Sequence, residues 1–319
     1  MGMSEAFLKP SFRKFKDAVW TPLDAGLRKL GGAPKSVQSV GFGALRGLFM
    51  IPYYLPGVPL RRTTTNFAAV IGEPSPRAFY RAFVRQVVLG LKGMEDLRSG
   101  RTESIDAMLR IPDQARLESV LAGGAGCLMV MPHCHGSVLA VRAMAARYPT
   151  LMLVSPTVKD KRAEAQLSYY KQLGCDFLDV RRSNEATVAR AILTAMRQGK
   201  IVVGIVDRIQ KAPKPGNAYN KSRDMVRVTA FGQPVGAPGW PARFGAKGKS
   251  PILPVMVEQT SDALTLHLGM AIEAGDIVET TQVWMQVIED FIRSFPRDWL
   301  FVYDKYWAGV LAQFAAENT

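Results

Sequence analysis

Short apolar runs alternate with helical patterns over most of the chain after residue 125. The runs have turn residues near their ends and cover residues 127–132, 151–155, 177–180, 201–206, 250–257 and 263–269. Apolar side chains recur at helical spacing over residues 161–173, 184–198 and 281–295. Strands that alternate with helices predict an α/β fold, with a central, mostly parallel sheet flanked by helices.

The first 98 residues have a helical pattern instead. Residues 5–30 alternate aromatic and aliphatic side chains with cations, which suits a helix on a membrane surface or one packed on the protein body. Residues 40–60 are apolar but interrupted by Arg46 and three prolines, so we expect an interfacial segment and no membrane span. Residues 61–98 are again helical, and Glu73-Pro74-Ser75-Pro76 marks a helix start. We expect a basic interfacial segment over 1–60 and a single α/β domain over 61–319.

The net charge narrows the choice of partners. The chain has 41 Lys and Arg against 27 Asp and Glu, a formal charge of +14 that attracts nucleic acid, an anionic membrane or an acidic carrier protein. It has no zinc-finger spacing and no long run of Lys and Arg, so we expect no nucleic acid partner. Three scattered cysteines predict a reducing compartment, and charges among the first 16 residues predict that no signal peptide is present.

Two of the three histidines flank Cys134 in the stretch His133-Cys134-His135-Gly136-Ser137, directly after the 127–132 run. Open α/β sheets bind their ligands at the carboxyl ends of strands. An imidazole at this place is suited to deprotonating a hydroxyl or an amine near neutral pH. Backbone N–H groups of Gly136 and Ser137, which open the next helix, are candidates for binding an oxyanion. The stretch therefore predicts a general-base site.

Other interpretations of the same stretch stay open. Cys134 is a candidate nucleophile that would carry an acyl group as a thioester, because a neighbouring imidazolium favours the thiolate. One histidine could equally orient the other. His133 and His135 supply only two metal ligands where a catalytic zinc usually has three, so we expect no metal.

Arginines follow two of the predicted strands. Arg181 and Arg182 come directly after the 177–180 run, and Arg208 follows Asp207 after the 201–206 run. Arg223 lies in the basic stretch 211–227, rich in Pro, Gly and Asn, which predicts a mobile flap or a plain exposed loop. Guanidinium forks at these places are candidates for binding a substrate phosphate, unless they are simply solvated or, for Arg208, paired with Asp207.

Near the end of the chain, five aromatic residues predict core packing or, alternatively, an interfacial belt. They are Trp299, Phe301, Tyr303, Tyr306 and Trp307.

The order of several short motifs identifies a family resemblance. The motifs are Arg61–Asn66, Glu73-Pro74-Ser75, the strand–His–Gly–helix unit at 127–145, Gly199–Asp207, Phe231–Val235, Pro251–Val255 and Phe295–Phe301. With these residues the chain resembles the bacterial lipid A biosynthesis (late) acyltransferases, relatives of the glycerophosphate acyltransferases. The resemblance implies transfer of a fatty acyl chain from acyl carrier protein or coenzyme A to a membrane lipid, without a further cofactor. It also implies a peripheral protein at the cytoplasmic face of the inner membrane.

The family motif, a histidine followed after four residues by Asp or Glu, is incomplete here. Counted from His133 the acidic position is Val138, and counted from His135 it is Ala140. The resemblance makes His133 the base, with His135 supporting or replacing it. Asp207 is the leading candidate for a carboxylate supplied from elsewhere, because it ends the 201–206 run, which could neighbour the 127–132 run, unless it only caps a turn. Without such a carboxylate, the scaffold would be a non-catalytic lipid-binding or assembly protein. A thioester hydrolase is a lesser alternative.

Overall fold

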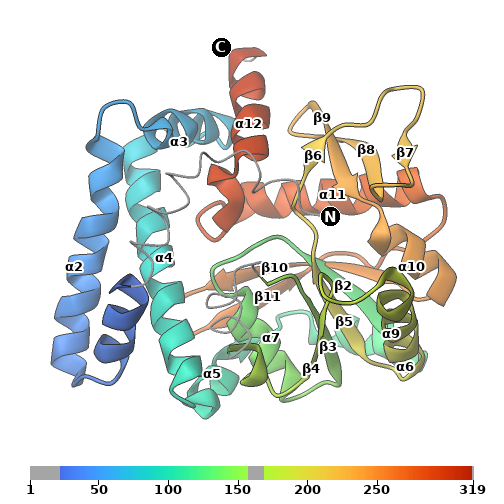
Figure 1. Cartoon of the computed structure of the whole chain (residues 1–319), viewed down its shortest axis with the longest axis horizontal. Coiled ribbons are helices and arrows are strands. Elements are labelled where there is room, and N and C mark those ends of the chain that lie inside the picture. Colours follow the sequence, from blue (N-terminus) through green and yellow to red (C-terminus); the bar gives the residue numbers. More distant parts are fainter. Residues whose placement is uncertain (1–21, 157–168, 318–319) are drawn as a thin grey trace.

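The computed structural model describes residues 22–156 and 169–317, and its centre is a seven-stranded sheet (Figure 1). The strand order is β1-β11-β10-β2-β5-β3-β4, and every neighbouring pair is parallel except β10 and β11. The strands are β1 (Leu109–Arg110), β11 (Leu264–Leu268), β10 (Ile252–Gln259), β2 (Cys127–Met131), β5 (Ile201–Ile205), β3 (Thr150–Val154) and β4 (Asp176–Asp179). This arrangement confirms the predicted α/β fold with a mostly parallel sheet.

The two central strands β2 and β5 lie side by side in exact step. Cys127 pairs with Ile201 and Met131 with Ile205, so both strands end at the same level of the sheet. All five residues of β2 are buried, as expected for a parallel strand covered on both faces. The helices around the sheet are α6 (Gln114–Ala122), α7 (Ser137–Ala145), α9 (Glu185–Arg197), α10 (Trp240–Gly248) and α11 (Ile277–Ser294).

A second, antiparallel sheet covers the far side of α11 (Figure 1). Its strands, in spatial order, are β6 (Gln210–Lys211), β9 (Gln233–Pro238), β8 (Met225–Ala230) and β7 (Tyr219–Asn220). The stretch 211–227, predicted as a mobile flap or an exposed loop, contains β7, the end of β6 and the start of β8, so it is partly strand. Val226, Val228 and Ala230 are buried in alternation with Arg227 and Thr229, and the charges of this stretch hid that period of two.

Before the sheet, and after a helical segment over residues 22–31, come α2 (Lys35–Tyr54), α3 (Pro59–Val70), α4 (Pro76–Arg98) and α5 (Thr102–Met108). The predicted helix start is confirmed, since the Ser75 side chain accepts the Ala78 N–H (3.2 Å) and Pro76 is the first residue of α4. The last helix, α12 (Lys305–Glu317), packs on α3. The division at residue 60 stays a prediction.

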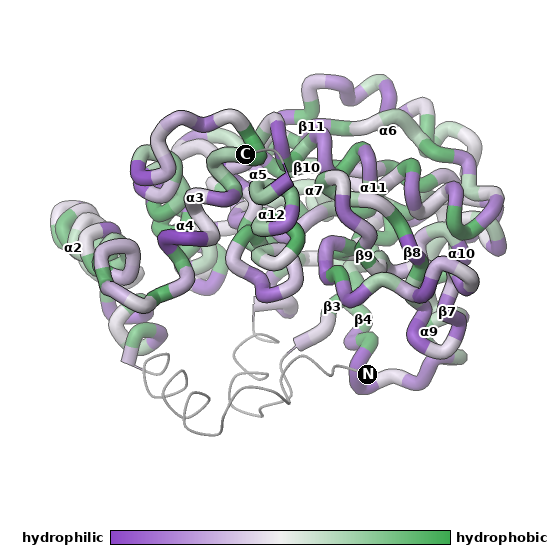
Figure 2. Tube along the Cα trace, turned by 90° about the horizontal axis from the view of Figure 1, so that it is seen from above, coloured by the Kyte–Doolittle hydropathy of each residue, from purple (hydrophilic) through white to green (hydrophobic). Residues whose placement is uncertain are grey.

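In both views α2 lies at the outer edge of the molecule, against α4 (Figures 1 and 2). None of the described helices is long and apolar enough to cross a membrane. The amphipathic pattern of residues 5–30 falls mainly outside the described residues, as does most of the helix predicted over 161–173.

Candidate active site

The ends of β2 and β5 bring His133 and Asp207 into direct contact. The ladder continues one step beyond the strands, where the Val206 N–H donates to the Met131 carbonyl (3.0 Å). His133 Nδ1 then lies 2.5 Å from Asp207 Oδ1, and the His133 backbone N–H donates to Asp207 Oδ2 (2.9 Å). The carboxylate is fully buried and the His133 side chain is 17% exposed. A hydrogen bond from Nδ1–H to the carboxylate leaves Nε2 as the unprotonated nitrogen of a neutral imidazole.

Two indole groups complete the surroundings of Asp207. Trp299 Nε1–H donates to Asp207 Oδ2 (2.8 Å), and Trp307 Nε1–H donates to the Asp207 backbone carbonyl (2.7 Å). Burial by itself raises the pKa of Asp207, but the nearby His133 and the hydrogen bonds from His133 and Trp299 outweigh it and hold the pKa below its usual value. Asp207 is therefore an ionised carboxylate at neutral pH.

An aromatic ring lies flat on the imidazole. The Phe301 and His133 ring centroids are 3.7 Å apart and their planes differ by 8°. The guanidinium carbon of Arg208 lies 5.8 Å from the centroid of Phe301. This contact limits the orientations open to the His133 ring and places one arginine beside the pair.

His135 has a different environment from His133. Its backbone N–H donates to the Asp298 carbonyl (3.2 Å), and its ring packs edge-on against Phe83. Burial lowers the pKa of His135 to about 4, and its buried Nε2 has no hydrogen-bond partner among the described residues. No carboxylate contacts the His135 ring among those residues, so the structure pairs Asp207 with His133 alone.

Cys134 is buried in the core and its thiol points at Met256, with 3.4 Å between the two sulfur atoms. Burial raises the pKa of this thiol, with further contributions from Asp298 and Asp207. A nucleophilic cysteine needs the opposite shift, toward a lower pKa. The geometry thus offers no support for Cys134 as a carrier of the acyl group.

The turn into α7 supplies backbone groups next to His133. Gly136 is the N-cap residue of α7, and a Cβ at this position would press on side chains of β10 and β11 at 3.1–3.3 Å. The Ser137 N–H donates back to the Cys134 carbonyl (3.2 Å), while its Oγ accepts the Cys134 N–H (3.0 Å). Of the two oxyanion candidates, Gly136 is the one whose N–H makes no backbone hydrogen bond among the described residues.

The four arginines predicted to bind phosphate have different surroundings. Arg181 and Arg182 follow β4, are exposed, and donate their backbone N–H groups to Asp179 Oδ1. Arg208 lies beside the pair, over the Phe301 ring that stacks on His133, and both partial desolvation and the charge of Arg181 lower its pKa. Arg223 lies exposed between β7 and β8 and makes no contact with the pair among the described residues.

The predicted aromatic cluster packs mainly in the core. Trp299 and Trp307 are fully buried, and Phe301, Tyr303 and Tyr306 are partly buried against the core. Sequence reasoning gave none of these residues a place in the site. A signal was available, because a buried indole N–H usually finds an acceptor, but the acceptor itself depends on the fold.

Sequence reasoning also missed Asp298, a buried carboxylate behind the histidine loop. Its Oδ1 accepts the Gln259 N–H (3.0 Å) and the Gln86 side-chain amide (3.1 Å). Burial, together with the charge of Glu258, raises the pKa of Asp298 to about 7 despite these hydrogen bonds.

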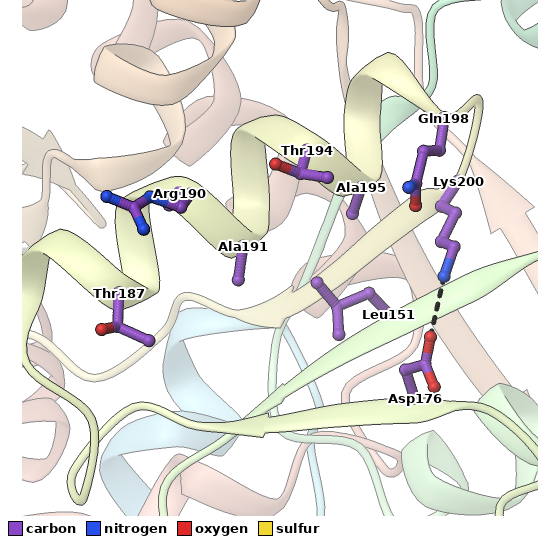
Figure 3. Close-up of a pocket in the computed structure, with 9 residues that line it drawn as sticks. All are labelled: Leu151, Asp176, Thr187, Arg190, Ala191, Thr194, Ala195, Gln198 and Lys200. Atoms are coloured by element: carbon purple, nitrogen blue, oxygen red, sulfur yellow. Dashed lines mark hydrogen bonds and ion pairs between the residues drawn. The ribbon is translucent and has the colours of Figure 1, made fainter.

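Two surface pockets lie away from the His133 pair. One of about 350 Å³ lies between α9 and the β3–β4 edge, and Figure 3 shows Lys200 turned toward Asp176 there (2.7 Å). The other, of about 430 Å³, is bounded by the turn before α4 and the carboxyl end of α11, and Asp298 lines it. Within the described residues, no group of three or more His, Cys, Asp and Glu is arranged to hold a metal ion.

Comparison with known proteins identifies the family of the chain. Residues 60–307 match the family described as "Bacterial lipid A biosynthesis acyltransferase". The chain is also similar to the phosphatidylinositol mannoside acyltransferases of two Mycobacterium tuberculosis strains, with 21% identity over 195 residues. That match covers 60% of this chain and 58% of each relative. Since the family match spans well over half of the chain, the protein belongs to the bacterial lipid A biosynthesis acyltransferase family.

Proposed function

We propose that this protein transfers a fatty acyl group from a thioester donor to a hydroxyl or amine of a lipid acceptor. The observation that carries the proposal is the 2.5 Å contact between His133 Nδ1 and Asp207 Oδ1, at the ends of two adjacent strands. It supplies an oriented imidazole although position 138 is a valine. Family membership and the acyltransferase names of the similar mycobacterial proteins support the reaction class.

The proposed mechanism is general-base catalysis by His133. Asp207 accepts the Nδ1–H, so Nε2 carries the lone pair that removes the proton from the acceptor hydroxyl. The acceptor oxygen then attacks the thioester carbonyl and forms a tetrahedral intermediate, and in this proposal the Gly136 N–H donates to its oxyanion. When the intermediate collapses, the C–S bond breaks and the leaving thiolate takes the proton back from Nε2. The products are an acylated lipid and a free thiol.

Two chemical features support an acyl carrier protein or coenzyme A as the donor. Both carriers present phosphate groups, and Arg208 lies beside the His133 pair, within the field of the Arg181 charge. The protein's charge of +14 also favours an acidic carrier. In this proposal Arg181 and Arg208 bind the donor phosphate, while Arg182 and Arg223 add to the positive field around the site.

We place the protein peripherally on the cytoplasmic face of the inner membrane. Of the nine large apolar side chains that are exposed among the described residues, six lie in or directly after α2: Val37, Val40, Leu48, Ile51, Tyr54 and Leu55. Such a face fits the interfacial region of a bilayer. The three cysteines are free, which suits a reducing compartment.

The non-catalytic alternative depended on the missing motif acid. The Asp207 carboxylate contacts His133 Nδ1, the atom that an orienting acid must hold, so no observation now favours that alternative. A thioester hydrolase would use the same base on water, and the product distinguishes the two activities: an acylated lipid for the transferase and a free fatty acid for the hydrolase.

The proposal is tested by incubating the purified protein with labelled acyl carrier protein or labelled acyl-CoA and a bacterial lipid extract. We expect the label to move to lipid with at least one donor, and the His133→Ala variant to lose this transfer. A His135→Ala variant is expected to retain part of it, because no carboxylate contacts that ring among the described residues. Free fatty acid without acylated lipid would reassign the protein as a hydrolase.

A Cys134→Ser variant tests the covalent route separately. We expect it to transfer label and to show no acyl group on the denatured protein, as for the wild type, because the thiol is buried and its pKa is raised. Label that survives denaturation on the wild type and disappears in Cys134→Ser would reinstate the thioester intermediate.

A further inference from the structure

The segment Asp298–Phe301, which follows α11, runs antiparallel along the histidine loop. The Leu300 N–H donates to the His133 carbonyl (2.7 Å), and the His135 N–H donates to the Asp298 carbonyl (3.2 Å). Cys134 and Trp299 lie opposite one another between these two hydrogen bonds. We call residues 298–301 the strap. Its main chain holds both ends of the loop that carries His133, so residues far apart in sequence form one unit.

The strap also delivers a hydrogen-bond donor to the carboxylate. Trp299 is fully buried, and its indole N–H lies 2.8 Å from Asp207 Oδ2. Its ring is held by packing against Phe67 (5.5 Å between centroids) and Trp307 (5.1 Å). A donor in a packed core cannot turn away from its acceptor at low cost, so the position of Oδ2 is fixed by the core of the protein.

Fixing Oδ2 also fixes the oxygen that faces the base. A carboxylate turns easily about its last side-chain bond, because that torsion has only broad minima. Oδ2 here takes two donors, the His133 backbone N–H and the Trp299 indole N–H, and this leaves Oδ1 directed at His133 Nδ1. The arrangement matters because Asp207 comes from a different strand than His133, with no helical turn to set their relative position.

We propose that Trp299 is a positioning residue of the His133–Asp207 pair: its indole N–H fixes Asp207 so that Oδ1 holds His133 with Nε2 free for the acceptor. The inference rests on the proposed function for the chemistry that Nε2 performs. The geometry of the pair is independent of the proposed function, because it can be measured without a substrate.

The proposal has a directional consequence for the pH dependence. The hydrogen bond from Trp299 is one of the interactions that keep the pKa of Asp207 low, so its loss raises that pKa. The acidic limb of the rate profile then moves to higher pH, because a carboxylate that has lost this donor holds a proton within the His133–Asp207 pair more strongly. The other charged or titratable groups near the pair include Arg208, Arg181, Asp298, Asp304, Tyr170 and Cys134. Trp299→Phe removes none of them.

The chain offers a matched control for a Trp299→Phe variant. Trp284 in α11 is also fully buried, but its indole N–H has no hydrogen-bond partner among the described residues. Trp284→Phe therefore removes the same group from the core without removing a hydrogen bond to the pair. Trp307→Phe is the second comparison, since it removes a donor to the Asp207 backbone and leaves the carboxylate's own donors intact.

We expect Trp299→Phe to lower kcat about ten- to a hundredfold, the usual size of a lost hydrogen bond to a charged group, with KM for the acyl donor within twofold. Its acidic limb should lie at higher pH than in the wild type. Trp284→Phe and Trp307→Phe should leave the acidic limb unmoved, even where they lower the melting temperature. An equal displacement of this limb in all three variants would show general loosening of the core and overturn the proposal.

A second measurement does not depend on catalysis. The chain has three histidines, so ¹⁵N-labelled imidazoles give a simple NMR spectrum in which His133→Ala assigns the proton shared with Asp207. The ¹⁵N shifts of the His133 ring follow the titration of the His133–Asp207 pair, which we expect to lie at a higher pH in Trp299→Phe than in the wild type. An unchanged titration overturns the proposal. If the wild type transfers no acyl group, the proposed function fails, while this titration still decides the role of Trp299.

Trp299→Phe also removes packing volume from the core, so a variant of the same shape is needed beside it. Replacing Trp299 with benzothienylalanine keeps the shape of the side chain and exchanges only the N–H for sulfur. We expect the titration of the pair to move to higher pH with this side chain as well. A titration equal to that of the wild-type protein would refute the role of the N–H.

Discussion

Residue 138, where the family motif would carry a carboxylate, is a half-buried valine in the first turn of α7. The carboxylate that contacts His133 comes from Asp207 instead, at the end of the neighbouring strand. Its side-chain oxygens take three hydrogen bonds, from the His133 ring, the His133 backbone and the Trp299 indole. A buried carboxylate stays ionised only with such support, which explains why so many donors converge on one residue.

The buried carboxyl group of Asp298 should make the stability of the protein depend on pH in the opposite direction from most carboxylates. Its pKa is raised from 3.8 to about 7, so between these values the folded protein holds a proton that the unfolded chain releases. The unfolding free energy therefore falls as the pH rises from about 4 to about 7. Asp298→Asn keeps an oxygen that accepts from Gln259 and removes this dependence. Across this range the wild type should lose on the order of 4 kcal/mol relative to the variant.

The measurement is denaturant unfolding of both proteins at a series of pH values. Asp290→Asn, an exposed position on α11, serves as the control and should follow the wild type at every pH. A constant difference between Asp298→Asn and the wild type from pH 4 to pH 8 would contradict the raised pKa.

How far the site could be read from the sequence differs from residue to residue. Asp207 was within reach because it follows an apolar strand, and the ends of neighbouring parallel strands meet at one edge. Trp299 was out of reach: 92 residues separate it from Asp207, and nothing in its local pattern names its acceptor. The environment of Cys134 could not be predicted either. Its histidine neighbours suggested a favoured thiolate, whereas burial raises the pKa of its thiol.

Strands β2 and β5 are the elements that make the pair possible. They run in step from Cys127–Ile201 to Met131–Ile205, so a displacement of one strand would separate His133 from Asp207. Gly126 lies at the start of this arrangement. Its N–H donates to the Met196 carbonyl (2.7 Å), and a Cβ on it would overlap the backbone carbonyl of Lys200, directly before β5.

Gly126→Ala should therefore destabilise the protein, by about 1–3 kcal/mol, because backbone atoms cannot move aside as a side chain can. We expect a melting temperature several degrees lower, measured by circular dichroism, and a loss of activity in the fraction that stays folded. Gly123→Ala is the matched control, since an added Cβ there meets nothing within 4 Å and the backbone is ordinary helix. Equal melting temperatures for the two variants would show that this close approach does not set the strands.

The elements differ in how visible they were in the sequence. The apolar runs of the central sheet became strands within a residue or two of their predicted ends, because strands covered on both faces have no polar positions to confuse the pattern. The antiparallel sheet was missed, because β6 and β7 have two residues each and β8 alternates apolar with polar side chains inside a basic stretch. Pairing between distant segments, not local preference, creates such short strands.

At the scale of the whole molecule, charge and apolar exposure coincide at one edge. From residue 25 to residue 72 the chain has six cations and no Asp or Glu. The same region contains α2 with its exposed apolar side chains, at the outer edge of the molecule (Figure 2). An anionic bilayer would satisfy both features at once, through burial of apolar surface and attraction of basic residues.

We expect the protein to bind vesicles that contain anionic phospholipid, and Leu48→Glu to weaken this binding about ten- to a hundredfold, since a leucine side chain contributes roughly 1.5–3 kcal/mol when buried. Co-sedimentation with vesicles of phosphatidylcholine and phosphatidylglycerol measures it. Met270→Glu is the control, because Met270 is also exposed, at 68%, but lies outside α2. Equal loss of binding in both variants would mean that charge alone, and not the α2 face, holds the protein to the bilayer.

The central claim is that His133 acts as the base and that an acid from another strand orients it. Its most direct test is the rate of acyl transfer from the labelled donor in the wild type, His133→Ala, Asp207→Asn and Val138→Ala. We predict a loss of about 10²–10⁴-fold for the first two variants, the usual contribution of a general base, and less than twofold for Val138→Ala. An Asp207→Asn protein that is folded and transfers acyl groups at the wild-type rate would contradict the account.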